Sequence, residues 1–199
     1  ELVVQAQALG LGALAMTDRD GVYGLVKAHI AARAQGLQLI AGAELTLAHP
    51  GSHDASQSEP SPLTRRAPLA VGSGQRTRVV ALVHDREGYA QLCRLISVGQ
   101  ARAPKGQSLL HPHELAALTH CELLCADPAL LAVLRLLPVR VSAYCARHLV
   151  AEERETERHL RTVAHALGLP VVGGLEVLYH HAQRRALQDV VACVRAGVT

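Results

Sequence analysis

The amino-acid sequence predicts an α/β fold in which a mostly parallel sheet is covered by helices. Short apolar runs typical of buried strands alternate with stretches in which apolar residues recur at helical spacing. The 199 residues, 49% of them hydrophobic, are enough for one domain with a sizeable core. We therefore expect a single domain over residues 1–199, with a sheet that forms either a barrel or an open layer.

The first half of the chain carries the patterns of three strands and three helices. The helix at 23–35 is expected to end at Gly36, because glycine favours the left-handed conformation found at helix ends. In chain order we expect a helix at 1–10, a strand at 13–17, a helix at 23–35, strands at 37–47 and 79–83, and a helix at 86–98.

The second half continues the alternation. The clearest helix is at 151–167, where apolar residues recur at i, i+3, i+4 and i+7, and Gly168-Leu169-Pro170 ends it. In chain order we expect a helix at 111–118, a strand at 122–125, a helix at 128–137, a strand at 139–144, the helix at 151–167, a strand starting at 171–172 and a helix at 183–196.

Residues 50–77 interrupt this pattern and are rich in Pro, Gly and Ser. Such a composition buries too little apolar area to offset the entropy of ordering the chain. We interpret 50–77 as a low-complexity surface insertion within the domain. We further expect 46–77 as a whole to be exposed, with a strand resuming near Arg78.

Composition limits the classes of function. The net charge is +3, Phe and Trp are absent and there are four Tyr, so a base-stacking surface for nucleic acid is not expected. The sequence contains no run of about 18 apolar residues, so no membrane span is predicted. The first residues lack the basic start and apolar stretch of a signal peptide. We expect a cytoplasmic protein without membrane contact.

Five cysteines are scattered through apolar segments, an odd number that favours reduced, buried thiols. Cys121 and Cys125, beside His120, form a weak zinc pattern, because structural zinc sites usually have more closely spaced cysteines and need further ligands.

The segment TDRDG at 17–21 follows the first predicted strand. The carboxyl ends of buried strands are where α/β folds carry their chemistry. The spacing of Asp18 and Asp20 is typical of a metal site, yet Arg19 lies between them, and a guanidinium has no lone pair to offer a metal. The simplest function of Asp20-Gly21 is the turn into the next helix.

Three segments resemble the PHP domain (polymerase and histidinol phosphatase) of bacterial C-family DNA polymerases. They are ALAMTDRDGVYGLVKAHIAARAQGLQLIAGAEL at 13–45, HDREGYAQLCRLI at 84–96 and LGLPVVGGLEVLYHHAQRRALQDVVACVRAG at 167–197. The last segment is the most specific and is most similar to the error-prone branch. The resemblance covers nearly the whole chain except 50–77 and a weaker stretch at 99–140.

This resemblance implies a PHP-type distorted (β/α) barrel, from which this chain lacks the first strand. It implies a parent protein that performs DNA-directed DNA synthesis, as a nucleotidyltransferase, in replication, DNA repair and tolerance of DNA damage. The magnesium-dependent polymerase site would lie outside this chain. DNA would be bound through the rest of the polymerase, with replication or repair proteins as further candidate partners. The domain itself would need no cofactor and would have a structural or docking role.

The family's active members hold metals at the barrel mouth through His, Asp, Glu and Cys, and hydrolyse phosphoesters. When the resemblance is followed residue by residue, Arg19 and Arg78 stand at two of the His positions. Glu44 is retained, and the final Asp-x-His becomes Glu176 and Leu178. The family's Cys has no firm match here, and Cys121 and Cys125 are the candidates, while His180 and His181 fall just after Leu178.

We therefore expect no bound metal and no catalytic residue, but a vestigial pocket formed by Asp18, Arg19, Glu44, Arg78 and Glu176. Our hypothesis is that the arginines replace the metals by pairing with Glu44, Glu176 or Asp18. At least one guanidinium nitrogen should then lie within about 4 Å of one of these carboxylates. The alternative is a metal-dependent phosphoesterase of the same superfamily.

Overall fold

A computed structural model describes residues 1–48, 77–146, 153–174 and 177–197. The strands are β1 (Ala13–Arg19), β2 (Gln38–Leu47), β3 (Thr77–Val83), β4 (Cys121–Cys125), β5 (Arg140–Ala146) and β6 (Val171–Gly174). The helices are α1 (Leu2–Ala8), α2 (Leu25–Gln35), α3 (Arg86–Arg102), α4 (Pro128–Leu134), α5 (Glu153–Ala166) and α6 (Arg185–Ala196), with short 3-10 helices η1 (Pro112–Ala117) and η2 (Ala182–Arg184).

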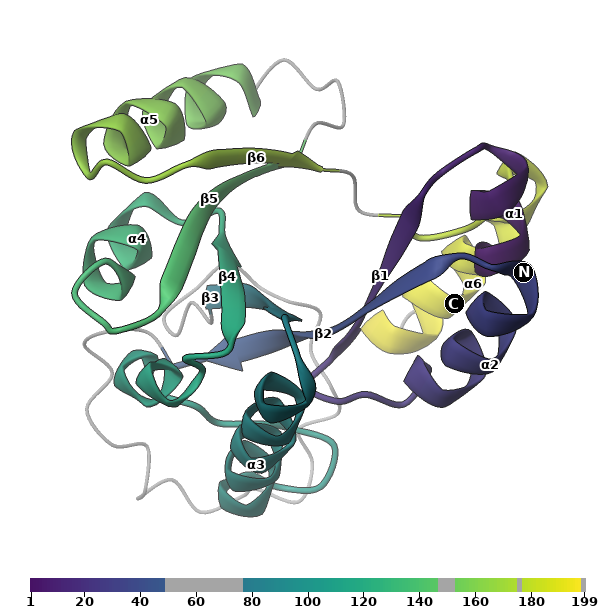
Figure 1. The fold of residues 1–199 in the computed structure, drawn as a ribbon, viewed down its shortest axis with the longest axis horizontal. Helices are drawn as coiled ribbons and strands as arrows, with labels where there is room; N and C mark the ends of the chain where they lie inside the picture. Colours follow the sequence, from purple (N-terminus) through teal and green to yellow (C-terminus); the bar gives the residue numbers. More distant parts are fainter. Residues whose placement is uncertain (49–76, 147–152, 175–176, 198–199) are drawn as a thin grey trace.

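The six strands form one sheet in the order β1-β2-β3-β4-β5-β6. The sheet curls into a half-barrel, with the helices along its outer side (Figure 1). The predicted α/β class is confirmed. The pairings β1–β2, β4–β5 and β5–β6 are parallel, but β3 runs antiparallel to both of its neighbours. The apolar pattern of β3 did not reveal this reversal, because the direction of a strand is set by its connections.

The predicted segments correspond to observed elements, with shifts at their ends. Asp85 begins α3 by accepting a hydrogen bond from the Gly88 N–H at 2.9 Å, and Gly36 follows α2 in the left-handed conformation. Helix α3 continues to Arg102, beyond the predicted end. The helix expected at 111–118 is the 3-10 helix η1, which is shorter.

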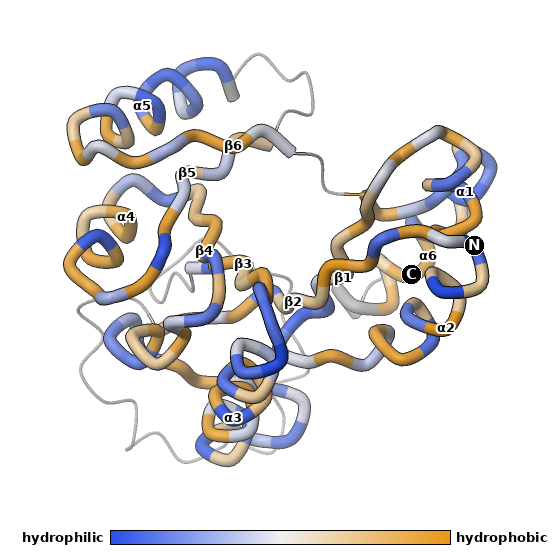
Figure 2. Tube along the Cα trace, in the orientation of Figure 1, coloured by the Kyte–Doolittle hydropathy of each residue, from blue (hydrophilic) through white to orange (hydrophobic). Residues whose placement is uncertain are grey.

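The main core lies between the sheet and the helices on its outer side. In β4 the side chains alternate strictly between buried and half-buried, so that one face of the strand is in the core and the other is partly exposed. The buried face continues through β2 and β3, and it packs against α3 and α4. In Figure 2 the hydrophobic colouring of these strands is interrupted by hydrophilic residues, as expected where one face of a strand lies outside the core. We call the opposite, half-exposed face of the sheet the inner face.

The expectation that 46–77 is exposed throughout is wrong for its first residues. Thr46, Leu47 and Ala48 are buried, because β2 extends to Leu47 and the Ala48 N–H then donates to the Leu110 carbonyl at 2.8 Å. The strand expected to resume near Arg78 is confirmed as β3, which begins at Thr77. The rest of the segment, including nearly all of the proposed insertion 50–77, lies outside the described residues.

A smaller core holds α1 and α2 against the start of the sheet, through Val3, Ala6, Ala32 and Leu37. The described cysteines form no disulfide. Within the described segments, no helix is both long enough and apolar enough to cross a membrane.

Candidate functional site

The register of three strands brings Arg19, Glu44 and Arg78 together. Because β1 and β2 are parallel, their carboxyl ends meet, and Arg19 lies directly opposite Glu44. Strand β3 is antiparallel, so that its first residues lie beside the last residues of β2, with Val80 opposite Glu44 and Arg78 opposite Thr46. Side chains two residues apart share a face, which places Arg78 on the same inner face as Glu44.

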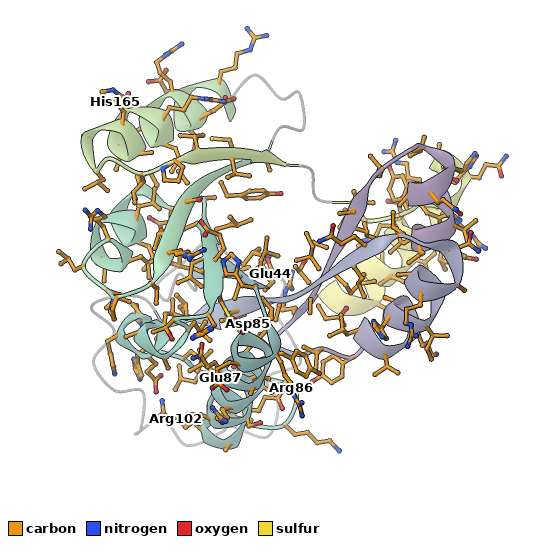
Figure 3. The ribbon with its side chains drawn as sticks, viewed as in Figure 1. Glu44, Asp85, Arg86, Glu87, Arg102 and His165 are labelled. Atoms are coloured by element: carbon orange, nitrogen blue, oxygen red, sulfur yellow. The ribbon has the colours of Figure 1, made fainter. Side chains whose placement is uncertain are left out.

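Both arginines contact the same carboxylate. Arg19 Nε lies 2.9 Å from Glu44 Oε2, and Arg78 Nη1 lies 3.4 Å from Glu44 Oε1. The exposed side-chain fractions are 39% for Arg19, 38% for Arg78 and 20% for Glu44. Figure 3 shows Glu44 on the curled sheet, well away from the α5 residue His165. The predicted approach of an arginine to a carboxylate is confirmed for Glu44, and it explains why an arginine stands at the end of β1.

The structure gives Asp18 a different function from the one that our hypothesis considered. Its side chain leaves β1 on the face opposite to Arg19, and its carboxylate accepts a hydrogen bond from the Gly24 N–H. Asp18 thereby fixes the loop that leads into α2. Among the described residues, Glu44 is the carboxylate that the two arginines contact.

Asp20 contributes more to the site than the turn that the sequence predicted. Its carboxylate accepts hydrogen bonds from both the N–H and the hydroxyl of Thr46, each at 2.8 Å. Its own N–H donates to the Glu44 carbonyl at 2.8 Å. Asp20 has a φ of 49°, in the left-handed region that Asp tolerates better than most residues. These bonds join the ends of β1 and β2 and so hold Arg19 beside Glu44.

The remaining predicted positions do not join this group within the described residues. Glu176 lies outside the described residues. Leu178 is 61% exposed and lines a cavity of about 400 Å³ between α1, α2 and α6. His180 lies at the same cavity, where its Nδ1 is 3.6 Å from Glu1 Oε2.

The structure does not bring His120, Cys121 and Cys125, the residues of the weak zinc pattern, together in one site. Cys121 and Cys125 are four residues apart on one extended strand, a separation of about 13 Å, and both are fully buried in the core. Burial raises the pKa of the Cys121 thiol to about 11 and that of Cys125 to about 12. A metal would have to displace a proton from each of these buried thiols, and their raised pKa makes that displacement more costly. His120 instead contacts Asp85, with 2.8 Å between His120 Nδ1 and Asp85 Oδ2.

A second acidic residue on the inner face was missed by the sequence analysis. Glu122 Oε1 accepts a hydrogen bond from the Ser142 hydroxyl at 2.5 Å, and His84 Nε2 lies 3.9 Å from Glu122 Oε2. The alternation along β4 could have placed Glu122 opposite the core. Its partners come from β5 and from the residue after β3, so that only the folded sheet identifies them.

We predict a small but measurable coupling between Arg19 and Glu44. Both arginine side chains are more than a third exposed, so that water screens the attraction, and a double-mutant cycle of Arg19→Ala and Glu44→Ala should give about 0.5–1 kcal/mol. Chemical denaturation of the four proteins measures it. The more exposed pair Arg94 and Glu87, 3.4 Å apart, is the matched control and should couple less. Strictly additive effects at Arg19 and Glu44 would exclude their direct interaction.

A family model described as PHP domain matches residues 1–168. An error-prone DNA polymerase from Anaeromyxobacter sp. (strain K) is 37% identical over 212 residues, an alignment that covers 100% of this chain and 17% of that protein. An error-prone DNA polymerase from Bordetella parapertussis is 33% identical over 223 residues, with 99% and 19% covered. This chain thus spans about a sixth of the length of these relatives.

Solved structures share the fold at low sequence identity. A structure assigned as a metal-dependent phosphoesterase, from Bifidobacterium adolescentis, superposes with a TM-score of 0.54 at 15% identity, covering 98% of this chain and 89% of that one. An amidohydrolase from Chromobacterium violaceum gives a TM-score of 0.53 at 12% identity, covering 87% and 80%.

Proposed function

Because the chain belongs to the PHP domain family, we propose that it is a non-hydrolytic PHP region of an error-prone DNA polymerase, where it has a structural or docking role. The homology to these polymerases extends over the full length of the chain. The synthesis of DNA in damage tolerance is the activity that we assign to the parent protein.

The pairing of Glu44 with two arginines is the observation that supports a non-hydrolytic domain. A PHP metal centre needs groups that donate electron pairs at the ends of β1 and β2 and at the start of β3. At two of those places the chain has guanidinium groups, which carry positive charge and have no lone pair. Both already contact the one carboxylate between them. A metal cation at Glu44 would have to displace both arginines and would be repelled by them, so the residues present do not fit the family's metals.

The other parts of the function follow from the relatives and remain proposals. DNA is the partner that we assign to the whole polymerase, which would contact it through regions outside this chain. Magnesium would serve the polymerase site in those regions, and the cytoplasm is the location where such an enzyme works. Replication or repair proteins are the candidate partners that this domain would dock.

We predict that the full chain, supplied with Mn²⁺ or Zn²⁺, hydrolyses neither a phosphomonoester nor the end of a DNA strand. Hydrolysis would require a metal ion that activates a water molecule. Arg19, Glu44 and Arg78 do not hold such a metal, because the two guanidinium groups offer it no ligand. Release of phosphate or nucleotides is the measurement, with Glu87→Ala as the control for contaminating enzymes. Metal-dependent hydrolysis that Glu44→Ala abolishes and Glu87→Ala leaves intact would favour the alternative, a metal-dependent phosphoesterase.

A further inference from the structure

We propose that Arg19 and Arg78 form a metal-independent binding site for a phosphate anion on the inner face of the sheet. This inference rests on the proposed function, because it needs the two arginines to stand where a metal centre would otherwise be. It assigns a ligand to a group of residues that the non-hydrolytic role leaves without one.

The first argument is the number of hydrogen-bond donors. A guanidinium carries N–H groups on three nitrogens, and each arginine directs one nitrogen at Glu44. Arg19 engages through Nε and Arg78 through Nη1, so that both Nη groups of Arg19 and the Nε and Nη2 groups of Arg78 have no partner among the described residues. Arginine forks of this kind match the oxygens of phosphate.

The second argument is the balance of charge. Two guanidinium cations share one carboxylate, which leaves one positive charge uncompensated within this group. The neighbouring carboxylates are directed elsewhere: Asp18 binds the Gly24 N–H and Asp20 binds Thr46. An anion bound between the two arginines would offset their mutual repulsion.

The third argument is the surface beside the arginines. In the row of residues that runs across the sheet from Glu44, the next members are Val80 and Leu124, which are apolar and half-buried. Glu122 lies on the same face but is one row further along β4, where it holds the Ser142 hydroxyl. These apolar side chains place no competing charge next to Glu44 in this row, while the exposure of the two guanidinium groups leaves them accessible to an anion from solvent.

The test is a calorimetric titration of the full chain with inorganic phosphate in the presence of EDTA. We expect binding in the millimolar range that weakens as salt is added. Arg78→Gln should lower the affinity roughly tenfold, because it removes a charged donor. Glu44→Gln should raise it roughly fivefold or more, because it removes the competing carboxylate but keeps a hydrogen-bond acceptor for the arginines. Arg94→Gln, at the exposed pair on α3, is the matched control and should change nothing.

Glu44→Gln separates this inference from the proposed function. If phosphate binds only when Mn²⁺ is added and Glu44→Gln abolishes the binding, the site is a metal centre and both proposals fail. If phosphate binds in neither condition, while each variant keeps the thermal midpoint of the original chain, this inference alone is overturned. Binding that Arg94→Gln weakens as much as Arg78→Gln would also overturn it.

The phosphate group could belong to a nucleotide or be free in solution, and competition identifies the source. A deoxynucleoside monophosphate that displaces inorganic phosphate, while the deoxynucleoside without phosphate does not, supports the site and assigns it to nucleotides. Failure of the monophosphate to compete, with inorganic phosphate still bound, supports the site and assigns it to the free ion.

Discussion

The variant Leu123→Ala is expected to lose about 2–5 kcal/mol of its free energy of unfolding. Leu123 is fully buried at the centre of β4. In register it lies between Ala81 of β3 and Val141 of β5, both of which are also buried. Truncation removes the transfer free energy of the side chain and leaves a cavity that two flanking strands prevent from collapsing.

The control for this variant is Leu136→Ala. Leu136 follows α4 and is 84% exposed, so the same change of side chain should alter stability by less than about 0.5 kcal/mol. Urea denaturation followed by circular dichroism measures both. Equal losses in the two variants would mean that Leu123 is not in a close-packed core.

Gly88→Ala is expected to destabilise the fold by about 1–3 kcal/mol, although alanine is the better helix former. Gly88 lies in the first turn of α3, where a Cβ would come within 2.2 Å of the His120 carbonyl oxygen. That oxygen belongs to the backbone just before β4 and also accepts a hydrogen bond from the His84 N–H at 3.1 Å. The oxygen cannot move away from Gly88 without breaking this hydrogen bond, which connects the residue after β3 to the residue before β4.

The matched control is Gly12→Ala, because a Cβ at Gly12 would meet no atom within 4 Å. We expect this variant to be as stable as the original chain or slightly more stable, since alanine reduces the entropy of the unfolded state. The thermal midpoints of Gly88→Ala, Gly12→Ala and the original chain measure these differences in stability. A Gly88→Ala variant that is more stable than Gly12→Ala would show that helix propensity outweighs the backbone contact.

The sequence by itself determined the kind and the order of the elements, because their signals are local. Gly36 ends α2, and Gly168 follows α5 before Pro170, as the sequence predicted. The resemblance to the PHP domain also pointed to Arg19 and Glu44 as residues of one site. These signals lie within a few residues of each other or within a recognisable segment, so that no folded structure is needed to read them.

The tertiary structure alone decided how the site is assembled, because strand direction and register join residues that are distant in the chain. The reversed β3 brings Arg78 to the end of β2, and the register of β1 puts Arg19 on Glu44 while Asp18 leaves on the other face. A shift of one residue in either pairing would exchange these faces. The contact of two arginines with one carboxylate therefore depends on the connections and packing of the whole sheet, which no local pattern encodes.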